Sequence, residues 1–258
     1  MTRIALVQLS VVDGDVDANI GRVQNLLAAT PPADLILLPE LWSTGYGHAV
    51  WNRAAAESTP DVISYIREVA VQRRATVGGS LLSRNENGKL VNRFWLIGPS
   101  GEMAWYDKGH LFAPLKEPEY LESGNQRKQT HLTSWCAALS ICFDLRFPEQ
   151  YRRDALDGAE LFLVVAAWPH PRSPALWTLA SARAIENQAV LALCNRVGAG
   201  TPNLSYCGES MVVLPGGEVI ADAGNEECVV VAEIDPACVE NARTKMPVLK
   251  LRSKELDW

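Results

Sequence analysis

The stretch Ala-Ala-Leu-Ser-Ile-Cys-Phe-Asp-Leu-Arg-Phe-Pro-Glu, residues 137–149, passes directly from an apolar run into polar residues and a proline. The run predicts a buried β-strand that ends at Cys142, and Pro148 suits the first turn of a following helix. A thiol at the carboxyl end of a strand can face a pocket while the sheet holds it rigid, which suits a nucleophile. Taken alone, Cys142 is better interpreted as structural, because cysteine is among the most buried residue types.

Strand and helix signals alternate on both sides of this stretch. Apolar runs predict strands at 4–9, 35–38, 76–82, 94–97, 103–106, 161–165 and 190–194. Helical spacing or composition predicts helices at 20–27, 61–73, 148–156 and 174–186. The rest reads as antiparallel strands at 211–214, 218–220 and 229–234, with a helix after Pro236. The turn signal Asn87-Gly88 predicts a hairpin, and no Gly- or Ser-rich linker interrupts the chain, so we expect one α/β domain over residues 1–258.

The composition is that of an ordinary globular protein of 258 residues with a formal net charge of −6. This acidic balance argues against a nucleic-acid surface, which needs clustered Lys and Arg. The apolar part of the amino terminus is too short for a secretory signal, and the most apolar stretch, 161–168, is far shorter than the roughly 20 residues of a membrane span. We therefore expect a cytoplasmic protein with neither a nucleic-acid nor a membrane partner.

The spacing of cysteine and histidine indicates neither a disulfide framework nor a metal centre. The six cysteines form no CxxC pair, and the four histidines show neither HxH nor HExxH spacing. We therefore expect reduced thiols, no metal and no cofactor.

Two charged residues also follow predicted strands. Glu40 ends the run Leu-Ile-Leu-Leu-Pro-Glu, where a poorly solvated carboxylate can act as a general base near neutral pH. Lys108 follows a strand in Trp-Tyr-Asp-Lys, where an ammonium can favour a thiolate or stabilise an oxyanion. Each residue alone is better interpreted as an ordinary loop residue. Because open α/β sheets bind ligands at the carboxyl ends of their strands, the two residues together with Cys142 indicate a catalytic site.

In this order and at this spacing, the three motifs resemble the nitrilase superfamily of carbon-nitrogen hydrolases. The resemblance extends from Ile-Ala-Leu-Val-Gln at 4–8 to Pro-Gly-Gly-Glu-Val-Ile at 215–220. It implies a four-layer α-β-β-α sandwich, a homodimer or higher homo-oligomer, and a Glu-Lys-Cys triad. In that triad Glu40 is the general base, Lys108 the oxyanion cation and Cys142 the nucleophile. By the same resemblance, the backbone N–H of Phe143 joins Lys108 in binding the oxyanion.

Many members of the superfamily also carry a second glutamate in the loop after the lysine, seven residues before a glycine. Glu117 has that spacing from Gly124 in Glu-Pro-Glu-Tyr-Leu-Glu-Ser-Gly, so the resemblance assigns it a supporting role. Glu119 and Glu122 are close alternatives. Without the resemblance, each of the three is a solvated loop glutamate.

Two later segments are similar to the bacterial branch of the superfamily that lies close to the omega-amidases. They are Ala-Ala-Trp-Pro-His-Pro-Arg-Ser-Pro-Ala-Leu-Trp at 166–177 and Cys-Asn-Arg-Val-Gly at 194–198. Omega-amidases deamidate small omega-amides such as 2-oxoglutaramate. Arg172 is then a candidate for holding a substrate carboxylate, because a guanidinium can bind one bidentately. Tyr46 and Trp168 are candidate pocket walls, although both also fit an ordinary core, and Arg172 fits a surface position equally well.

The predicted reaction is hydrolysis of a small amide through a thioester. Cys142 attacks the amide carbonyl, and Glu40 takes the thiol proton and gives it to departing ammonia. Water activated by Glu40 then releases the carboxylic acid. A nitrilase, a carbamoylase or a broad aliphatic amidase would use the same triad. A non-hydrolytic binding or regulatory protein would keep the fold alone.

Other polar residues near these motifs are expected to be structural. Asp144 and Arg146 are expected to brace the turn after Cys142 through ion pairing. Arg183, Glu186 and Asn187 share one predicted helix and are expected to pair within it or across a subunit interface. Cys194 also ends a predicted strand, but it lies in no nucleophile motif, so Cys142 is preferred over it.

Overall fold

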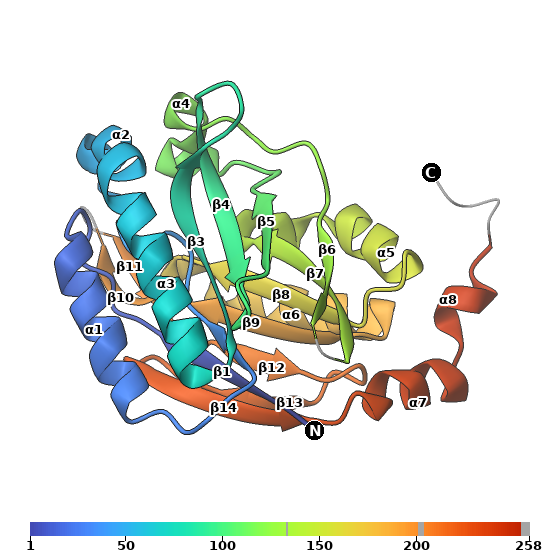
Figure 1. Ribbon diagram of the computed structural model, residues 1–258. Helices are drawn as coiled ribbons and strands as arrows, with labels where there is room; N and C mark the ends of the chain where they lie inside the picture. Colours follow the sequence, from blue (N-terminus) through green and yellow to red (C-terminus); the bar gives the residue numbers. More distant parts are fainter. Residues whose placement is uncertain (133, 201–203, 254–258) are drawn as a thin grey trace.

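The computed structural model describes residues 1–132, 134–200 and 204–253. Figure 1 shows two large β-sheets that lie one against the other, with helices on the outer side of each. This order of layers confirms the α-β-β-α sandwich that the sequence resemblance implies.

The first sheet has six strands in the order β14-β1-β2-β3-β4-β5. Its parallel centre consists of β1 (Thr2–Gln8), β2 (Leu35–Leu37) and β3 (Thr76–Arg84). The flanking strands run antiparallel to their neighbours and are β4 (Leu90–Ile97), β5 (Met103–Asp107) and β14 (Cys228–Ile234). The hairpin predicted from Asn87-Gly88 joins β3 to β4, and Gly88 adopts the positive φ that such a turn requires.

The second sheet has the order β13-β12-β9-β8-β7-β6. Its parallel centre consists of β7 (Trp135–Ile141), β8 (Leu161–Ala166) and β9 (Val190–Asn195). The antiparallel strands are β6 (Gln129–Leu132), β12 (Met211–Val213) and β13 (Val219–Asp222). Cys142 follows β7 and Ala167 follows β8, so both residues lie at the carboxyl edge of this sheet.

Four long helices cover the outer faces of the two sheets (Figure 1). The first sheet packs against α1 (Val16–Ala28) and α3 (Thr59–Arg73), and the second against α5 (Pro148–Leu156) and α6 (Ser173–Asn187). The carboxyl-terminal part adds α7 (Ala237–Lys245) and α8 (Val248–Leu251). Among the described residues, no helix combines the length and the apolar character needed to cross a bilayer.

Strand β1 shows how side chains alternate between two cores. Ile4 and Leu6 pack toward the second sheet, whereas Ala5 and Val7 pack toward α1 and α3, and all four are fully buried. Because successive side chains of a strand point to opposite faces, a strand buried on both faces needs an unbroken apolar sequence. The apolar run at 4–9 is therefore typical of a strand in one of the two inner layers of the sandwich.

The short elements near the strand ends escape prediction from sequence patterns. They include α2 (Trp51–Arg53), the π-helical turn η2 (Ala54–Ser58), α4 (Glu117–Tyr120), β10 (Val197–Gly200) and β11 (Leu204–Cys207). Most have only three or four residues, which is too few for a periodic pattern, and β6 consists largely of polar residues.

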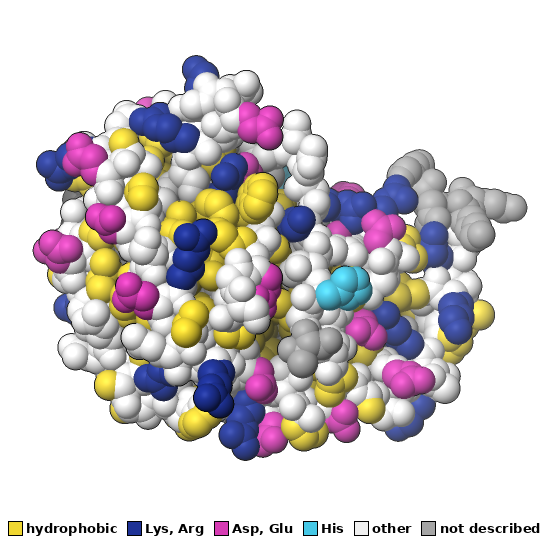
Figure 2. Space-filling view, viewed as in Figure 1, with side chains coloured by type: hydrophobic (Ala, Val, Ile, Leu, Met, Phe, Trp, Pro, Cys, Tyr) yellow, Lys and Arg dark blue, Asp and Glu magenta, His cyan; other side chains and the backbone are white. Residues whose placement is uncertain are grey.

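Figure 2 shows Lys and Arg side chains interspersed with Asp and Glu over the face in view.

Candidate active site

Cys142 is the first residue after β7 and begins the 3₁₀ turn η4 (Cys142–Arg146). Its φ of +46° lies in the left-handed region, which costs a residue with a side chain roughly 1–3 kcal/mol. Asp144 supports the turn, because its Oδ2 accepts a hydrogen bond from the Ile141 N–H at 2.9 Å. The chain thus leaves the strand abruptly and turns the thiol out of the strand direction.

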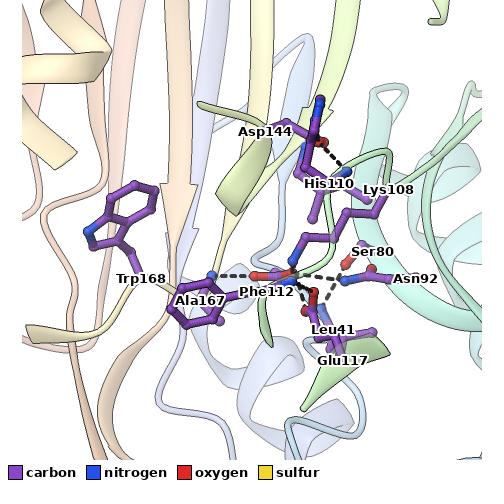
Figure 3. A network of polar contacts seen from close by, with 12 residues as sticks. Leu41, Ser80, Asn92, Lys108, His110, Phe112, Glu117, Asp144, Ala167 and Trp168 are labelled. Carbon is purple, nitrogen blue, oxygen red and sulfur yellow. Dashed lines mark hydrogen bonds and ion pairs between the residues drawn. The ribbon is translucent and has the colours of Figure 1, made fainter. Parts of the chain in front are cut away.

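Lys108, the residue that follows β5, is buried between two carboxylates (Figure 3). Lys108 Nζ is 2.7 Å from Glu40 Oε1 and 2.8 Å from Glu117 Oε1, and all three side chains are inaccessible to solvent. Glu119 and Glu122, the alternatives considered for the second glutamate, are exposed. Of the three glutamates in this loop, Glu117 is therefore the one that contacts Lys108.

The backbone around Glu40 ties the two sheets together. The Glu40 N–H donates to the Ala166 carbonyl oxygen at 3.3 Å, and Glu40 Oε2 accepts from the Ala167 N–H at 2.9 Å. Glu40 Oε1 also accepts from Asn92 Nδ2 at 2.8 Å. The carboxylate that follows β2 is thus held by β4 and by the end of β8.

Glu117 is held equally firmly on its short helix α4. Its Oε1 accepts from the Tyr46 hydroxyl at 2.7 Å, and its Oε2 accepts from the Phe112 N–H at 2.6 Å. Gly124, the glycine of the spacing that selects Glu117, lies where a Cβ atom would be 2.1 Å from the Asp107 carbonyl oxygen. The loop closes onto β5 only with glycine at that position.

Burial and these neighbours set the protonation of the cluster. Burial lowers the pKa of Lys108, but the carboxylates of Glu117 and Glu40 outweigh this effect and raise its pKa above 10.5. Burial raises the pKa of Glu117, helped by Glu40 and opposed by Lys108. Burial also raises the pKa of the Tyr46 phenol, which keeps its proton and donates a hydrogen bond to Glu117. Because its pKa is raised, Lys108 is therefore protonated and positively charged at neutral pH.

The thiol itself is protonated at rest. Burial and the Glu40 carboxylate raise the pKa of Cys142 well above 9.0, and the opposing effect of Lys108 is smaller. The expectation that a nearby lysine favours the thiolate is therefore outweighed in the free protein. A nucleophilic role for this thiol would therefore require a base that removes its proton.

A small, narrow pocket opens beside the thiol. It is lined by Phe112, Cys142, Phe143, Arg146, Trp168, Pro169 and Arg172. Three residues selected from the sequence as substrate contacts, Phe143, Trp168 and Arg172, are among them. Tyr46, selected as a wall, is not in this lining, because its hydroxyl points to Glu117.

Arg146, the other arginine in the pocket lining, does not form the ion pair with Asp144 that the sequence led us to expect. The Asp144 carboxylate binds Ile141, Tyr106 and His110 instead. The Arg146 guanidinium lies over the Trp168 ring, 5.0 Å from its centroid. Within the described part of the chain, neither Arg146 nor Arg172 forms an ion pair with a carboxylate.

Two other residues selected from the sequence have structural contacts. Arg183 Nη1 lies 2.9 Å from Glu186 Oε1 within α6. Cys194 is fully buried at the end of β9, and its Sγ donates to the carbonyl oxygens of Val7 and Leu37 in the opposite sheet. Burial raises the pKa of this thiol too, with no charged residue of the cluster among the causes. Cys194 therefore bridges the sheets.

Asn92, Phe112 and Ala167 contact the charged cluster and escape sequence-based selection. Of the three, only Asn92 gives a signal in the sequence, as a polar residue within the largely apolar strand β4. Its amide is fully buried in the structure. Phe112 and Ala167 act through backbone N–H groups, for which side-chain identity carries no signal. In the described ranges, no group of three or more His, Cys, Asp and Glu side chains is arranged to hold a metal ion.

A thiol on a sharp turn, beside a charged lysine and a buried carboxylate, is the arrangement of enzymes that act through a covalent nucleophile. The family model of the carbon-nitrogen hydrolases matches residues 3–244. This chain belongs to the carbon-nitrogen hydrolase family, and it is a hydrolase of carbon-nitrogen bonds.

Relatives with assigned activities match over nearly their full length. The omega-amidase YafV of Escherichia coli is 37% identical over 246 residues, which cover 95% of this chain and 94% of that protein. The 2-oxoglutaramate amidase of Bacillus subtilis is 31% identical over 255 residues, 98% of each chain. The crystal structure of XC1258 from Xanthomonas campestris, a CN-hydrolase superfamily protein with an arsenic adduct in its active site, matches with a TM-score of 0.91 and 31% identity. It covers 98% of this chain and 97% of that one.

Proposed function

We propose that this protein is an omega-amidase-like amidohydrolase, which cleaves a small linear amide of the 2-oxoglutaramate type to a carboxylate and ammonia. The observation that carries the proposal is the Glu40-Lys108-Glu117 cluster beside Cys142, at a pocket that also contains two arginines. The similarity to two amidases over nearly the whole chain supports the same reaction class. We further propose one catalytic domain, a homodimer or higher homo-oligomer, and a cytoplasmic location.

Acylation begins with proton transfer from Cys142. Glu40 accepts the thiol proton as sulfur attacks the amide carbonyl carbon, and the carbonyl oxygen becomes an oxyanion. Lys108 and the backbone N–H of Phe143, in the first turn of η4, donate to this oxyanion. Each donor typically contributes about 3 to 4 kcal/mol of transition-state stabilisation.

Collapse of the tetrahedral intermediate breaks the carbon-nitrogen bond. Glu40 returns its proton to the nitrogen, ammonia leaves, and a thioester remains on Cys142. In the second half, Glu40 takes a proton from water as the water oxygen attacks the thioester. The carboxylic acid then leaves, and Glu40 returns the proton to the sulfur.

Glu117 keeps Lys108 in place through this cycle. Each time Glu40 becomes protonated, its attraction for the ammonium weakens, but Glu117 remains at 2.8 Å from Nζ. The Tyr46 hydroxyl and the Phe112 N–H hold the Glu117 carboxylate in turn. Glu117 is thus a supporting residue.

The two arginines favour a substrate that carries a carboxylate away from its amide. Arg172 and Arg146 line the pocket beside Cys142, and guanidinium groups bind carboxylates with two parallel hydrogen bonds. Phe143 and Trp168 provide apolar walls for the short carbon chain between the two ends.

A substrate panel with ammonia release as the readout tests this proposal. We expect 2-oxoglutaramate and succinamate to be hydrolysed with a kcat/KM at least about a hundredfold above that of propionamide, which has no carboxylate for the arginines to bind. Nitriles and N-carbamoyl compounds complete the panel, and Cys142→Ala is the control. Turnover of nitriles or N-carbamoyl compounds alone would contradict the omega-amidase proposal. A fully inert thiol, with neither ammonia release nor an acyl adduct on Cys142 for any amide tested, would instead support a binding protein.

A further inference from the structure

The carboxylate of Asp144 is fully buried two residues after Cys142 and accepts four hydrogen bonds. Its Oδ2 accepts from the Ile141 N–H and from the Tyr106 hydroxyl, each at 2.9 Å. Its Oδ1 accepts from the His110 N–H at 2.9 Å and from His110 Nδ1 at 2.8 Å. The carboxylate therefore has its full complement of donors.

These donors belong to the two segments that carry the thiol and the ammonium. Ile141 immediately precedes Cys142, whereas Tyr106 and His110 lie two residues before and two residues after Lys108. Figure 3 shows Asp144 bonded to His110 on the side of Lys108 away from Glu117. The Asp144 carboxylate thus links the turn η4, which begins at Cys142, to the segment around Lys108.

His110 adds a second contact between the same segments. Because Asp144 accepts hydrogen bonds, Nδ1 of His110 must carry a proton, which fixes the ring orientation. The ring stacks on Phe147, with centroids 3.6 Å apart and planes within 9° of parallel. Phe147 directly follows η4 and caps it, so His110 contacts Asp144 within the turn and the residue just after the turn.

We propose that Asp144 and His110 form a positioning pair, which sets the Lys108 ammonium and the Phe143 N–H at the right distance from the Cys142 sulfur. This inference rests on the proposed function of Lys108 and Cys142. An oxyanion site must be held within about 0.5 Å of its working geometry by the residues around it. Cys142 also needs support for its positive φ, and the Asp144 hydrogen bond to Ile141 supplies it.

Neither member of the pair lines the pocket at Cys142. A positioning role therefore predicts an effect on the chemical step and little effect on substrate binding. A general structural role predicts a loss of folding stability with normal kcat in the molecules that remain folded. The split between kcat and KM distinguishes the two.

Two substitutions of His110 separate its hydrogen bond from its stacking. His110→Phe keeps a ring against Phe147 and removes the Nδ1 donor, whereas His110→Asn removes the ring and places an amide N–H near the Nδ1 position. We expect His110→Phe to lower kcat at least tenfold with KM changed less than threefold. His110→Asn should recover most of that kcat. His131→Phe, at an exposed histidine on β6, is the matched control and should behave like the unsubstituted protein.

Tyr106→Phe provides a second variant, because it removes one donor to Asp144 without changing His110. It should lower kcat at least threefold, with a thermal unfolding midpoint measured in parallel. The kinetics use the amide of the panel that is hydrolysed fastest by the unsubstituted protein.

A normal kcat in His110→Phe or in Tyr106→Phe overturns the positioning role. So does an equal loss in His110→Phe and His110→Asn, or a rise in KM alone. If His110→Phe does not fold, the result for Tyr106→Phe decides. Full activity of Cys142→Ala would defeat the proposed function as well. An inactive Cys142→Ala with a fully active His110→Phe would defeat the positioning pair alone.

Discussion

Cys142 and Cys194 end two parallel strands of the same sheet, yet their surroundings differ. Both thiols are buried, and burial raises the pKa of each. Cys194 keeps to its strand and donates to two carbonyl oxygens of the opposite sheet. Cys142 lies on a turn of positive φ beside a pocket, and Glu40 and Lys108 influence its pKa. Of these two thiols, only Cys142 therefore has the sharp turn and the nearby carboxylate that a nucleophile requires.

The largest expected effect contrasts these two cysteines directly. Cys142→Ala should lower kcat for the best amide by at least about a thousandfold, because it removes the proposed covalent nucleophile. Cys194→Ala should lower kcat less than threefold, although it leaves a gap between the sheets. Ammonia release measures both, and intact mass detects the acyl adduct. Similar losses in the two variants would remove the distinction between the thiols.

The next effect tests the charges that only Cys142 has nearby. Lys108→Met leaves the Glu40 and Glu117 carboxylates buried without their cation, so unfolding free energy should fall by about 3 to 5 kcal/mol, together with activity. Chemical denaturation measures the change. Lys116→Met, at an exposed lysine in the same loop, should change it by less than about 0.5 kcal/mol. Equal stabilities would show that the cluster does not depend on Lys108.

A smaller effect tests the pocket that lies beside Cys142. Arg172→Leu should raise KM for 2-oxoglutaramate roughly tenfold, because a half-buried guanidinium contributes less than a buried one to carboxylate binding. KM for propionamide should remain within twofold. The exposed Arg153 on α5 provides the control Arg153→Leu. An equal rise in KM for both substrates would assign Arg172 to the shape of the pocket and not to carboxylate binding.

The smallest effect concerns the raised pKa that the Cys142 and Cys194 thiols have in common. The pKa of Cys142 is raised in the folded state, whereas an unfolded thiol titrates near about 8.5. The folded state therefore holds more protons above that pH, and stability falls as pH rises, by up to about 1.4 kcal/mol per pH unit relative to Cys142→Ser. Cys194→Ser should show the same direction. Urea unfolding at pH 7.5 and 9.5 measures this difference, and a difference independent of pH would contradict the raised pKa.

The long elements of the fold could be predicted from local patterns. The helix predicted at 148–156 coincides with α5, and the strand predicted at 161–165 lies within β8. Apolar runs and helical periodicity are properties of neighbouring residues, so a sequence displays them directly. Helix α4 was expected to be a loop, because four residues beginning with Glu-Pro-Glu give no such pattern.

The candidate site was predictable where a side chain follows a strand, as for Glu40, Lys108 and Cys142. Glu117 was selected through the family spacing, and the structure explains the glycine of this spacing by the close approach of Gly124 to Asp107. The Asn92-Glu40 and Asp144-His110 contacts were not predictable, because they join residues from elements that are distant in the sequence. The roles of all these residues stay predictions until the variants are measured.

The two carboxylates around Lys108 also have a consequence for the entropy of each catalytic cycle. A free lysine side chain has about 2 kcal/mol of rotamer entropy to lose when it is fixed in one conformation. With Glu40 and Glu117 on its ammonium, Lys108 loses this freedom during folding. In the proposed mechanism the ammonium is then already oriented when the oxyanion forms, so turnover would not require the side chain to become ordered again.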